Sequence, residues 1–460
     1  MCVDFAPDLS ETFIYKTGTL TGHREETAVS QTSIRLAVLA TLPLIAPSLA
    51  HAAAFQLKED SAQYLGQAFA GSSSAAEAPS TVFDNPAGMT KLNGLQIQGG
   101  ATVIVPSFTF RGGATSAFGK PISGFDGRDG GNVALVPSLF ATYKITPDLA
   151  VGIAITSPFG LAVTYGPNFV GRYNADKSDL KTLNINPAIA YQVTNWLSLG
   201  AGMSAQYARA EFSSFINSST ILTSLTKKPT AAPDGYFRLR GDDWSFGYNL
   251  GALVTPGPQT NIGLAYRSRV QQDISGTADF SMPLPLSLSP SFRSSNARAK
   301  IVLPDTATLS ITQHMGPNWT GYAEVNWTNW SQFKNLSAFR DDGTNQNLTN
   351  VKQNYHNSVF AALGVSYKVI EPLTVRIGTA YDTTPTSNSY RTARVPDADR
   401  IWLALGASYE VLPGVKADFG YAHVFVKDSK ITDTDTTGDT LRGRYRNSID
   451  IVSVGTRTSF

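Results

Sequence analysis

The sequence predicts an all-β protein, a transmembrane antiparallel β-barrel of about fourteen strands, and three observations lead to this prediction. Apolar residues recur at every second position over most of the chain. Short turns alternate with long polar loops between these stretches. No long apolar run follows residue 54, which excludes membrane-spanning helices. Successive side chains of a strand point to opposite faces, so each stretch can present one face to lipid and one to a polar interior.

The clearest alternation lies between Trp196 and Glu211. Its apolar row is Leu197, Leu199, Ala201, Met203, Ala205 and Tyr207, and its small or polar row is Ser198, Gly200, Gly202, Ser204 and Gln206. The same pattern recurs over 262–269, 363–369 and 401–409, and each of these rows carries a tyrosine that suits the lipid headgroup region. The chain ends on a similar row that runs from Val452 to Phe460, which is common for the last strand of outer-membrane barrels.

Composition supports one large barrel rather than several soluble domains. The 460 residues have a mean hydropathy of -0.10 and 16% charged residues, and a barrel with an aqueous interior needs only half of each strand to be apolar. The net charge of +2 indicates no nucleic acid partner. The single cysteine, Cys2, lies upstream of the predicted cleavage site, so disulfides, thiolate chemistry and a lipid-anchored cysteine are excluded from the mature chain.

The N-terminal residues predict export. Residues 1–31 are polar and mixed in charge, and they suggest a misassigned start codon. Residues 32–52 resemble a signal peptide, with Arg35 as the positive charge, an apolar core from Leu36 to Ala46 and a small-residue cleavage site at Ala50-His51-Ala52. The predicted location is the outer membrane of a Gram-negative bacterium, with the barrel at 95–460.

The connections alternate in length, as an even-numbered barrel with both ends on one side requires. The short turns contain Pro, Gly, Asn or Asp, and they lie at Thr146-Pro147-Asp148, Thr194-Asn195, Pro256-Gly257-Pro258, Gly316-Pro317-Asn318, Glu371-Pro372 and Pro413-Gly414. The long loops are expected around 110–130, 167–180, 213–234, 278–295, 338–350, 384–396 and 427–442. We expect the loops to face the cell exterior and the turns the periplasm.

Residues 53–94 do not fit the wall, because they have no sustained period of two. This segment is rich in Ala, Ser and Gly, with apolar residues such as Phe55, Leu65 and Phe69 that would gain nothing from remaining in solvent. A barrel of this width either fills its lumen or conducts. We therefore expect a plug, or hatch, inside the barrel. A disordered exported tail is the alternative.

Motifs along the chain resemble the long-chain fatty acid transporter family of the FadL type. In the plug segment these are Ala53-Ala54-Phe55-Gln56-Leu57, Leu65-Gly66-Gln67-Ala68-Phe69-Ala70-Gly71 and Asn85-Pro86-Ala87-Gly88. In the barrel they are Ser157-Pro158-Phe159-Gly160-Leu161, Gly171-Arg172-Tyr173, Asn186-Pro187-Ala188-Ile189-Ala190-Tyr191, Tyr266-Arg267-Ser268, Asn329-Trp330-Ser331 and Pro396-Asp397-Ala398-Asp399-Arg400. The resemblance covers essentially the whole mature chain, and the order and spacing of the motifs make it specific.

Pro158 and Gly160 lie inside the predicted third strand. Proline cannot donate to a sheet ladder and glycine weakens it, so we expect a bulge or an inward kink. A harmless irregularity of the strand is the alternative. In the family that the chain resembles, such a kink contacts the Asn-Pro-Ala motif of the plug and forms a lateral opening. The resemblance thus implies a gate made of Asn85, Pro86, Ala87, Pro158, Phe159 and Gly160.

Ligand binding without bond making is the chemistry that these features predict. The fourth long loop is unusually apolar, with Phe280, Leu284 and Leu286 among its residues, and an exposed apolar patch often marks an interaction site. The resemblance implies an internal pocket that includes Phe55. Four basic residues are candidates to bind an anionic headgroup: Arg172, Arg267, Arg269 and Lys368. We include Arg172 in the predicted ligand site. Each of the four is more often a solvated or salt-bridged residue of the lumen. Arg391, Arg394, Asp397, Asp399 and Arg400 are expected to compensate one another's charges.

The predicted function is uptake of hydrophobic compounds, with long-chain fatty acids as the default ligand and lateral release through the kinked strand. An aromatic hydrocarbon channel of the same family is the alternative, followed by a general diffusion porin. Catalysis is not expected, because His314, His356 and His423 stand in no recognisable triad setting. No cofactor or metal is expected. The expected partners are the hydrophobic ligand, outer-membrane lipid and lipopolysaccharide, and the barrel assembly machinery at the C-terminal strand, with the protein a monomer.

Overall fold

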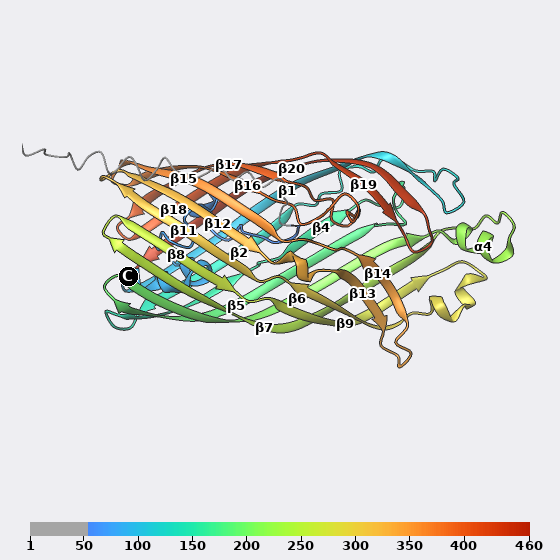
Figure 1. Cartoon of the computed structure of the whole chain (residues 1–460), viewed down its shortest axis with the longest axis horizontal. Coiled ribbons are helices and arrows are strands. Elements are labelled where there is room, and N and C mark those ends of the chain that lie inside the picture. Colours follow the sequence, from blue (N-terminus) through green and yellow to red (C-terminus); the bar gives the residue numbers. More distant parts are fainter. Residues whose placement is uncertain (1–53) are drawn as a thin grey trace, which may run out of the picture. The chain divides into compact units, whose positions relative to one another are not determined.

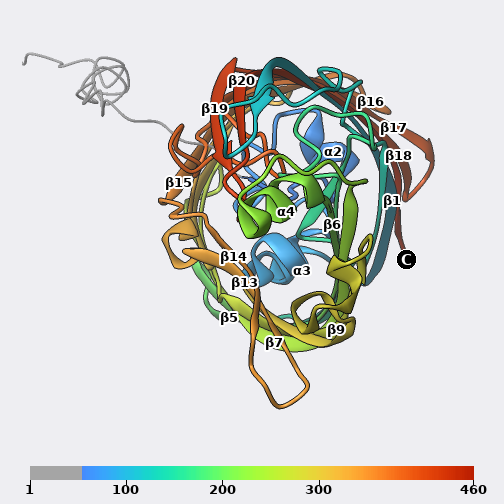
Figure 2. The same ribbon diagram turned by 90° about the vertical axis from the view of Figure 1, so that its right-hand side faces the viewer.

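The computed structural model describes residues 54–460, which form a closed antiparallel β-barrel with a short segment inside it (Figures 1 and 2). The barrel is closed because β1 pairs with β2 on one side and with β20 on the other. The predicted extension at 1–31 and the predicted signal peptide at 32–52 lie outside the described residues. Within 54–460, no helix combines the length and the apolar character needed to cross a membrane.

The described residues contain twenty strand segments, which make fourteen wall strands and so confirm the predicted fold class. Eight wall strands are continuous: β1 (Leu95–Thr115), β2 (Ala134–Lys144), β5 (Lys177–Thr194), β6 (Leu197–Ile216), β7 (Gly235–Gly257), β16 (Leu373–Asp382), β17 (Arg400–Leu412) and β20 (Thr440–Ser459). Six consist of two segments each: β3 (Leu149–Thr156) with β4 (Gly160–Thr164), β8 (Thr260–Arg267) with β9 (Val270–Ser281), β10 (Ser295–Leu303) with β11 (Thr306–Met315), β12 (Trp319–Thr328) with β13 (Asn335–Arg340), β14 (Asn347–Lys352) with β15 (Ser358–Ile370), and β18 (Val415–Val426) with β19 (Ser429–Thr434).

The predicted alternation along the strands is confirmed. In β6, Met203 is 67% exposed on the outer face, whereas its neighbour Ser204 is 3% exposed toward the lumen. All six predicted short turns lie between consecutive wall strands. The turns gather at one end of the barrel, with the C-terminal residue, and the longer loops at the other (Figure 1).

Several predicted loops are shorter than expected, because the strands continue into them. β1 extends to Thr115, β6 to Ile216 and β20 begins at Thr440, all inside the ranges predicted as loops. Beyond the apolar band the outer faces of these strands are polar, so the apolar period of two that marks a lipid-facing strand is lost. The loops themselves carry α4 (Ser218–Thr226), η2 (Leu286–Leu288) and η3 (Pro290–Phe292), and η4 (Trp330–Gln332) separates β12 from β13.

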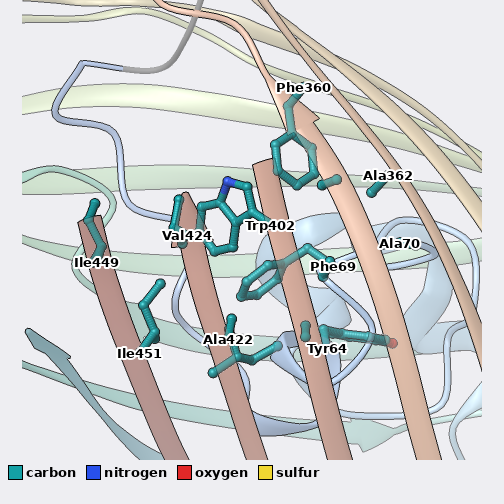
Figure 3. Close-up of a cluster of buried hydrophobic side chains, with 14 of the residues drawn as sticks. Tyr64, Phe69, Ala70, Phe360, Ala362, Trp402, Ala422, Val424, Ile449 and Ile451 are labelled. Carbon is teal, nitrogen blue, oxygen red and sulfur yellow. The ribbon is translucent and has the colours of Figure 1, made fainter. Parts of the chain in front are cut away.

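The segment at 54–94 lies inside the barrel, where Figure 2 shows α2 and α3 within the ring of strands. It contains α2 (Ala62–Leu65), α3 (Thr81–Asp84) and η1 (Pro86–Lys91), and most of its residues are buried. Tyr64 and Phe69 pack against Phe360, Trp402 and other inward side chains of β15, β17, β18 and β20 (Figure 3). Burial of these rings supplies the apolar contact that holds the plug in the lumen.

Glycines let the plug backbone approach the wall closely. A Cβ atom at Gly378 of β16 would lie 2.2 Å from the carbonyl carbon of Gln67, and one at Gly406 of β17 would lie 2.6 Å from the Cα of Gly66. On the other side of the lumen, a Cβ atom at Gly263 of β8 would lie 1.9 Å from the Ser73 carbonyl oxygen. Only a residue without a side chain fits at these positions. The wall therefore has glycine where the plug backbone touches it.

Candidate functional site

The third wall strand is broken at Ser157-Pro158-Phe159, between β3 and β4. Thr156 lies opposite Asn184 of β5, and Gly160 lies opposite Lys181. Three residues of the broken strand therefore stand opposite two of β5, which makes the break a bulge of one extra residue. Proline cannot take part in the ladder as a donor, and a bulge bends the strand that carries it.

The bulge leaves a gap in the wall. β2 pairs with β3 only as far as Leu139, which lies opposite Ile155. Continued register would place Val136 opposite Pro158, but the two segments are not paired there and β4 pairs only with β5. Loop residues 130–132 contact β4 higher up, through the Gly131–Val163 bridge. The outer rim of the gap carries Leu135, which is 67% exposed, and is therefore apolar where it faces lipid.

The first described residues of the plug close this gap from within. The Leu57 amide donates a hydrogen bond to the Pro158 carbonyl oxygen (2.9 Å), and the Gly160 amide donates to the Phe55 carbonyl oxygen (3.0 Å). Gln56 thus forms an antiparallel bridge with Phe159. The Phe159 amide donates to the Thr182 hydroxyl oxygen (3.0 Å), which fixes the inward bend of the strand. Plug and bulge form one hydrogen-bonded unit.

Phe55 and Phe159 meet in an aromatic cluster in the lumen. The ring centroid of Phe55 lies 4.7 Å from that of Trp330, 5.8 Å from that of Phe333 and 6.3 Å from that of Phe159. All four rings are buried. Trp330 was not among the predicted site residues; the sequence indicated only interface and lumen packing for Trp327 and Trp330, on a single strand over Asn326–Phe333, whereas β12 ends at Thr328 and Trp330 begins a short turn. Edge-to-face pairs of this kind add about 0.5–1.5 kcal/mol each to the burial of their area.

Apolar residues connect this cluster with a pocket higher in the lumen. The buried cluster of Phe55, Phe159 and Trp330 continues without a break to Ala210, Ile274, Ile301 and Leu336, with Phe212 and Val351 beside it. The latter residues line an apolar pocket, together with Phe237, Leu239 and Ala297. An outer depression between the loops shares four lining residues with the pocket, namely Phe237, Thr349, Val351 and Arg394. The apolar surface therefore runs from the loop end of the barrel to the bulge.

Among the described residues of the lumen, Arg394 is the one cation that lines this apolar pocket and has no carboxylate partner. Its guanidinium Nη1 donates to the carbonyl oxygens of Lys177 (3.2 Å) and Ser213 (3.1 Å), and it lies 3.5 Å from the Ser178 hydroxyl. No ion pair with a carboxylate is present for it within the described residues. Burial lowers the pKa of Arg394 to about 10, while Asp433 and Asp176 act in the opposite direction. The side chain remains charged at neutral pH.

Three of the four other candidate cations have partners of their own. Arg172 forms an ion pair with Asp234 (Nε to Oδ2, 2.7 Å) and also contacts Tyr173. Lys368 pairs with Glu371 near the turns. Arg267 donates to the Phe83 carbonyl oxygen (2.6 Å) and stacks on the Phe83 ring, so it holds the plug. Arg269 lies between β8 and β9 and, within the described residues, does not line the pocket.

The cluster at 391–400 compensates its charges only in part. Arg400 pairs with Asp397 (2.6 Å), and Asp399 pairs with Lys427 outside the cluster (3.8 Å). The Arg400–Asp397 pair also holds the plug. The Ala54 amide donates to Asp397 Oδ2 (3.1 Å), and Arg400 Nη2 donates to the Ala54 carbonyl oxygen (3.3 Å). Arg394 lies apart from this pair. Spacing in the sequence could not separate the two roles.

The remaining predicted residues lie in two other places. Asn85-Pro86-Ala87 contact β6 and β7, where Asn85 donates to the Ala252 carbonyl oxygen (3.0 Å) and a Cβ atom at Gly200 would meet Ala87. Within the described residues, the backbone hydrogen bonds between the bulge and the plug involve Phe55 and Leu57 rather than Asn85-Pro86-Ala87. In the fourth loop, Leu286 is 4% exposed and Leu284 is 72% exposed, and neither lines the outer depression. Phe280 and Phe292 of this loop do line it.

Carboxyl groups gather beside the bulge, where Glu59 and Glu324 are buried and Asp60 and Asp84 are half-buried. Glu59 and Asp60 follow the segment that pairs with the bulge, and Asp60, Asp84 and Glu324 line a cavity that also contacts Pro158 and Phe159. Burial raises the pKa of Asp60 to about 7, with the neighbouring Glu59 adding to the shift while its own backbone, Lys58 and Arg267 oppose it. Burial likewise raises the pKa of Glu59. A buried carboxyl is more stable neutral, so we expect this end of the plug to respond to pH.

Comparison with known proteins shows which family the sequence matches. The model of the family described as outer membrane protein transport protein (OMPP1/FadL/TodX) matches residues 44–460. Outer membrane protein P1 of Haemophilus influenzae is 30% identical over 430 residues, which cover 87% of this chain and 92% of the relative. The long-chain fatty acid transport protein of Escherichia coli is 29% identical over 421 residues, which cover 86% and 92%.

Solved structures agree with the fold. A FadL homologue from Pseudomonas aeruginosa is similar with a TM-score of 0.83 and 25% identity, over 89% of this chain and all of that one. The toluene transporter TodX of Pseudomonas putida is similar with a TM-score of 0.67 and 16% identity, over 88% of this chain and all of that one. At that identity the second likeness concerns the fold alone.

Proposed function

The chain belongs to the OMPP1/FadL/TodX family of outer membrane transport proteins and carries hydrophobic compounds, and from that premise we propose that it takes up long-chain fatty acids and releases them sideways into the membrane. A fatty acid enters from the outer depression, binds with its chain in the apolar pocket and its carboxylate at Arg394, and passes along the aromatic cluster to the gap beside the bulge. Nothing in this sequence of steps requires a bond to be made.

One observation carries the proposal: the buried apolar cluster is continuous from the pocket at Arg394 to Phe55 and Phe159 at the wall gap. Each methylene that leaves water for such a surface gains about 0.8 kcal/mol, so a long acyl chain is held without many polar contacts. Arg394 supplies a charge-assisted hydrogen bond for the carboxylate, which is worth about 1.5–3 kcal/mol. The E. coli relative, a long-chain fatty acid transport protein, supports the same ligand class.

Uptake of an aromatic hydrocarbon is the second candidate, because the cluster at the bulge consists of rings. Phe55, Phe159, Trp330 and Phe333 offer edge and face contacts that suit a neutral aromatic ligand. A neutral hydrocarbon has no carboxylate to accept a hydrogen bond from Arg394. A toluene transporter of Pseudomonas putida shares this fold.

Uptake of labelled oleate by a deletion strain complemented with this chain tests the route. Deletion of Phe159 together with Pro158→Val removes the extra residue and restores the donor, so that β3 and β4 become one regular strand and the gap closes. We expect oleate uptake to fall to the level of the deletion strain, whereas Pro158→Val alone keeps the extra residue and should retain uptake. Normal uptake by the straightened barrel, once its folding is verified by heat-modifiable migration, would overturn lateral release.

Binding to purified protein tests the ligand class. Arg394→Gln should weaken oleate binding about tenfold or more, as expected for loss of a charge-assisted hydrogen bond. Toluene binding should be unchanged. Equal oleate binding by both forms, with toluene bound and carried in complemented cells, would favour the aromatic candidate.

A further inference from the structure

A second surface, unrelated to the lumen, carries an unusual concentration of positive charge. Arg111 of β1, Lys430 of β19, and Arg442, Arg444 and Arg446 of β20 are all exposed. Their neighbours Phe110, Ile431, Leu441 and Tyr445 are buried in the lumen, so the five basic side chains point away from the barrel. We call these five residues the outer basic patch. It lies at the loop end of the barrel, where β19 and the start of β20 are found (Figure 1).

The register places like charges directly opposite one another. Arg444 lies opposite Arg111 on one side and opposite Lys430 on the other. Like charges at directly opposed positions destabilise a sheet. Within residues 54–460, Arg111, Arg442, Arg444 and Lys430 have no ion-pair partner, and Arg446 has only Asp428 at 3.8 Å. The fold alone therefore gives no reason for this arrangement.

The opposite wall follows a different rule, since bases there have acids beside them. Lys300 lies opposite Asp273, Arg240 Nε lies 3.9 Å from Asp279, and Arg209 lies opposite Asp242 as well as Lys181. Exposed strands outside the membrane can thus carry balanced charge in this protein. The imbalance at the outer basic patch is a local feature, which points to an anion that supplies the missing charge.

The patch lies directly above the apolar band of the wall. On the membrane side of it, the same outward rows continue with Val105, Phe425 and Val452, which are 42%, 51% and 38% exposed. Asp450 lies within these rows, directly opposite Val105, and its carboxylate accepts a hydrogen bond from the Tyr421 hydroxyl (2.8 Å) and contacts His423 Nδ1 (2.8 Å). Tyrosine of this kind is typical of the membrane interface. A ligand bound here would contact charge with one end and apolar surface with the other.

We propose that the outer basic patch binds the phosphate groups of a phosphorylated glycolipid of the outer leaflet, the lipid A part of lipopolysaccharide, whose acyl chains lie along the apolar band. Arginine is suited to phosphate because its planar guanidinium donates two parallel hydrogen bonds. Three arginines at alternate positions of β20, with Arg111 and Lys430 at either side, offer donors across three strands. The amphipathic surface selects a lipid headgroup over a soluble anion.

Binding of lipid A to the purified full-length barrel in detergent tests the proposal, with native mass spectrometry as the readout and lipid A with or without its phosphates as probes. We expect the phosphorylated form to bind and the form without phosphates to bind far more weakly. Replacement of Arg442, Arg444 and Arg446 by Gln should weaken binding of the phosphorylated form about 100-fold, and Arg444→Gln alone about fivefold.

The opposite wall provides the matched control. Gln at Arg209, Arg240 and Lys300 removes the same number of outward charges and should leave lipid A binding unchanged. Should the patch triple variant fail to fold, the single Arg444→Gln barrel and its rescue by Arg444→Lys decide the question. Equal binding of both lipid A forms, or equal losses in the patch and control variants, would overturn the proposal without bearing on fatty acid uptake.

Discussion

The plug is held in two different ways at its two ends. Its body, Ser61–Leu92, lies against glycines of the wall, with backbone contacts that leave no space for a Cβ atom at Gly378 or Gly406. Its leading segment, Ala54–Asp60, is held by two backbone hydrogen bonds to the bulge, a few polar contacts and aromatic rings. Close backbone packing has no alternative arrangement nearby, whereas hydrogen bonds and rings can exchange partners. The contrast predicts that the leading segment moves while the body stays docked.

The largest expected effect comes from disturbing the body. Gly378→Val would place side-chain atoms within 2.2 Å of the Gln67 backbone, which cannot give way like the end of a flexible side chain. We expect docking of the plug body to lose about 3 kcal/mol or more. Planar bilayers with this variant should show steady aqueous channels that the unmodified protein lacks.

Gly99→Val is the matched control, because a Cβ atom at Gly99 of β1 would have its nearest neighbour at 3.9 Å. Its conductance should equal that of the unmodified protein. Closed barrels in both variants would show that the glycine contacts are not what keeps the body in place, and the contrast between the two ends would then fail.

A smaller effect is expected from pH, and it should be confined to the leading segment. The pKa of Asp60 is raised to about 7 by burial. A group with a raised pKa binds its proton more tightly when docked, so its contribution is fully present below its ordinary pKa of 3.8 and is lost as the pH rises through about 7. Protection of the Leu57 and Gly160 amides against hydrogen exchange should therefore fall between pH 5 and pH 8, by about tenfold or more.

Substitution separates this effect from general instability. Asp60→Asn should reduce the pH dependence, and Glu59→Gln added to it should remove most of what remains, since burial raises the pKa of Glu59 as well. Asp428→Asn on the outer wall should leave the profile as it is. A pH profile that is unchanged in Asp60→Asn would contradict the assignment.

Local patterns in the sequence predicted much of the fold. The period of two located strands such as β6 and β17, and turn residues such as Pro413-Gly414 located the connections, because both signals depend on neighbours in the chain. The break at Pro158 was predicted for the same reason. The first residues of β20, Thr440–Arg442, were assigned to a loop, because this end of the strand has an exposed charged residue on its outer face and so gives no apolar alternation.

The candidate site was harder to predict, since it is assembled from distant segments. The apolar pocket draws on six wall strands and on Arg394, whose sequence neighbours Arg391 and Asp397 indicated charge compensation instead. Phe280, Leu284 and Leu286 were all selected for being apolar, yet of these only Phe280 lines the outer depression, together with Phe292. Spacing along a chain does not tell which of several apolar residues meet across a lumen.

The smallest expected effect tests the rings of the leading segment. Phe55→Leu keeps most of the buried apolar area but loses the edge contacts with Trp330 and Phe333, which should weaken docking of the leading segment by about 1 kcal/mol. Exchange at the Leu57 and Gly160 amides should then rise about fivefold. Phe69→Leu makes the same change in the plug body, where Phe69 meets Trp402, and should leave both amides unaffected. If Phe69→Leu exposes them equally, the plug undocks as one unit and the leading segment has no motion of its own.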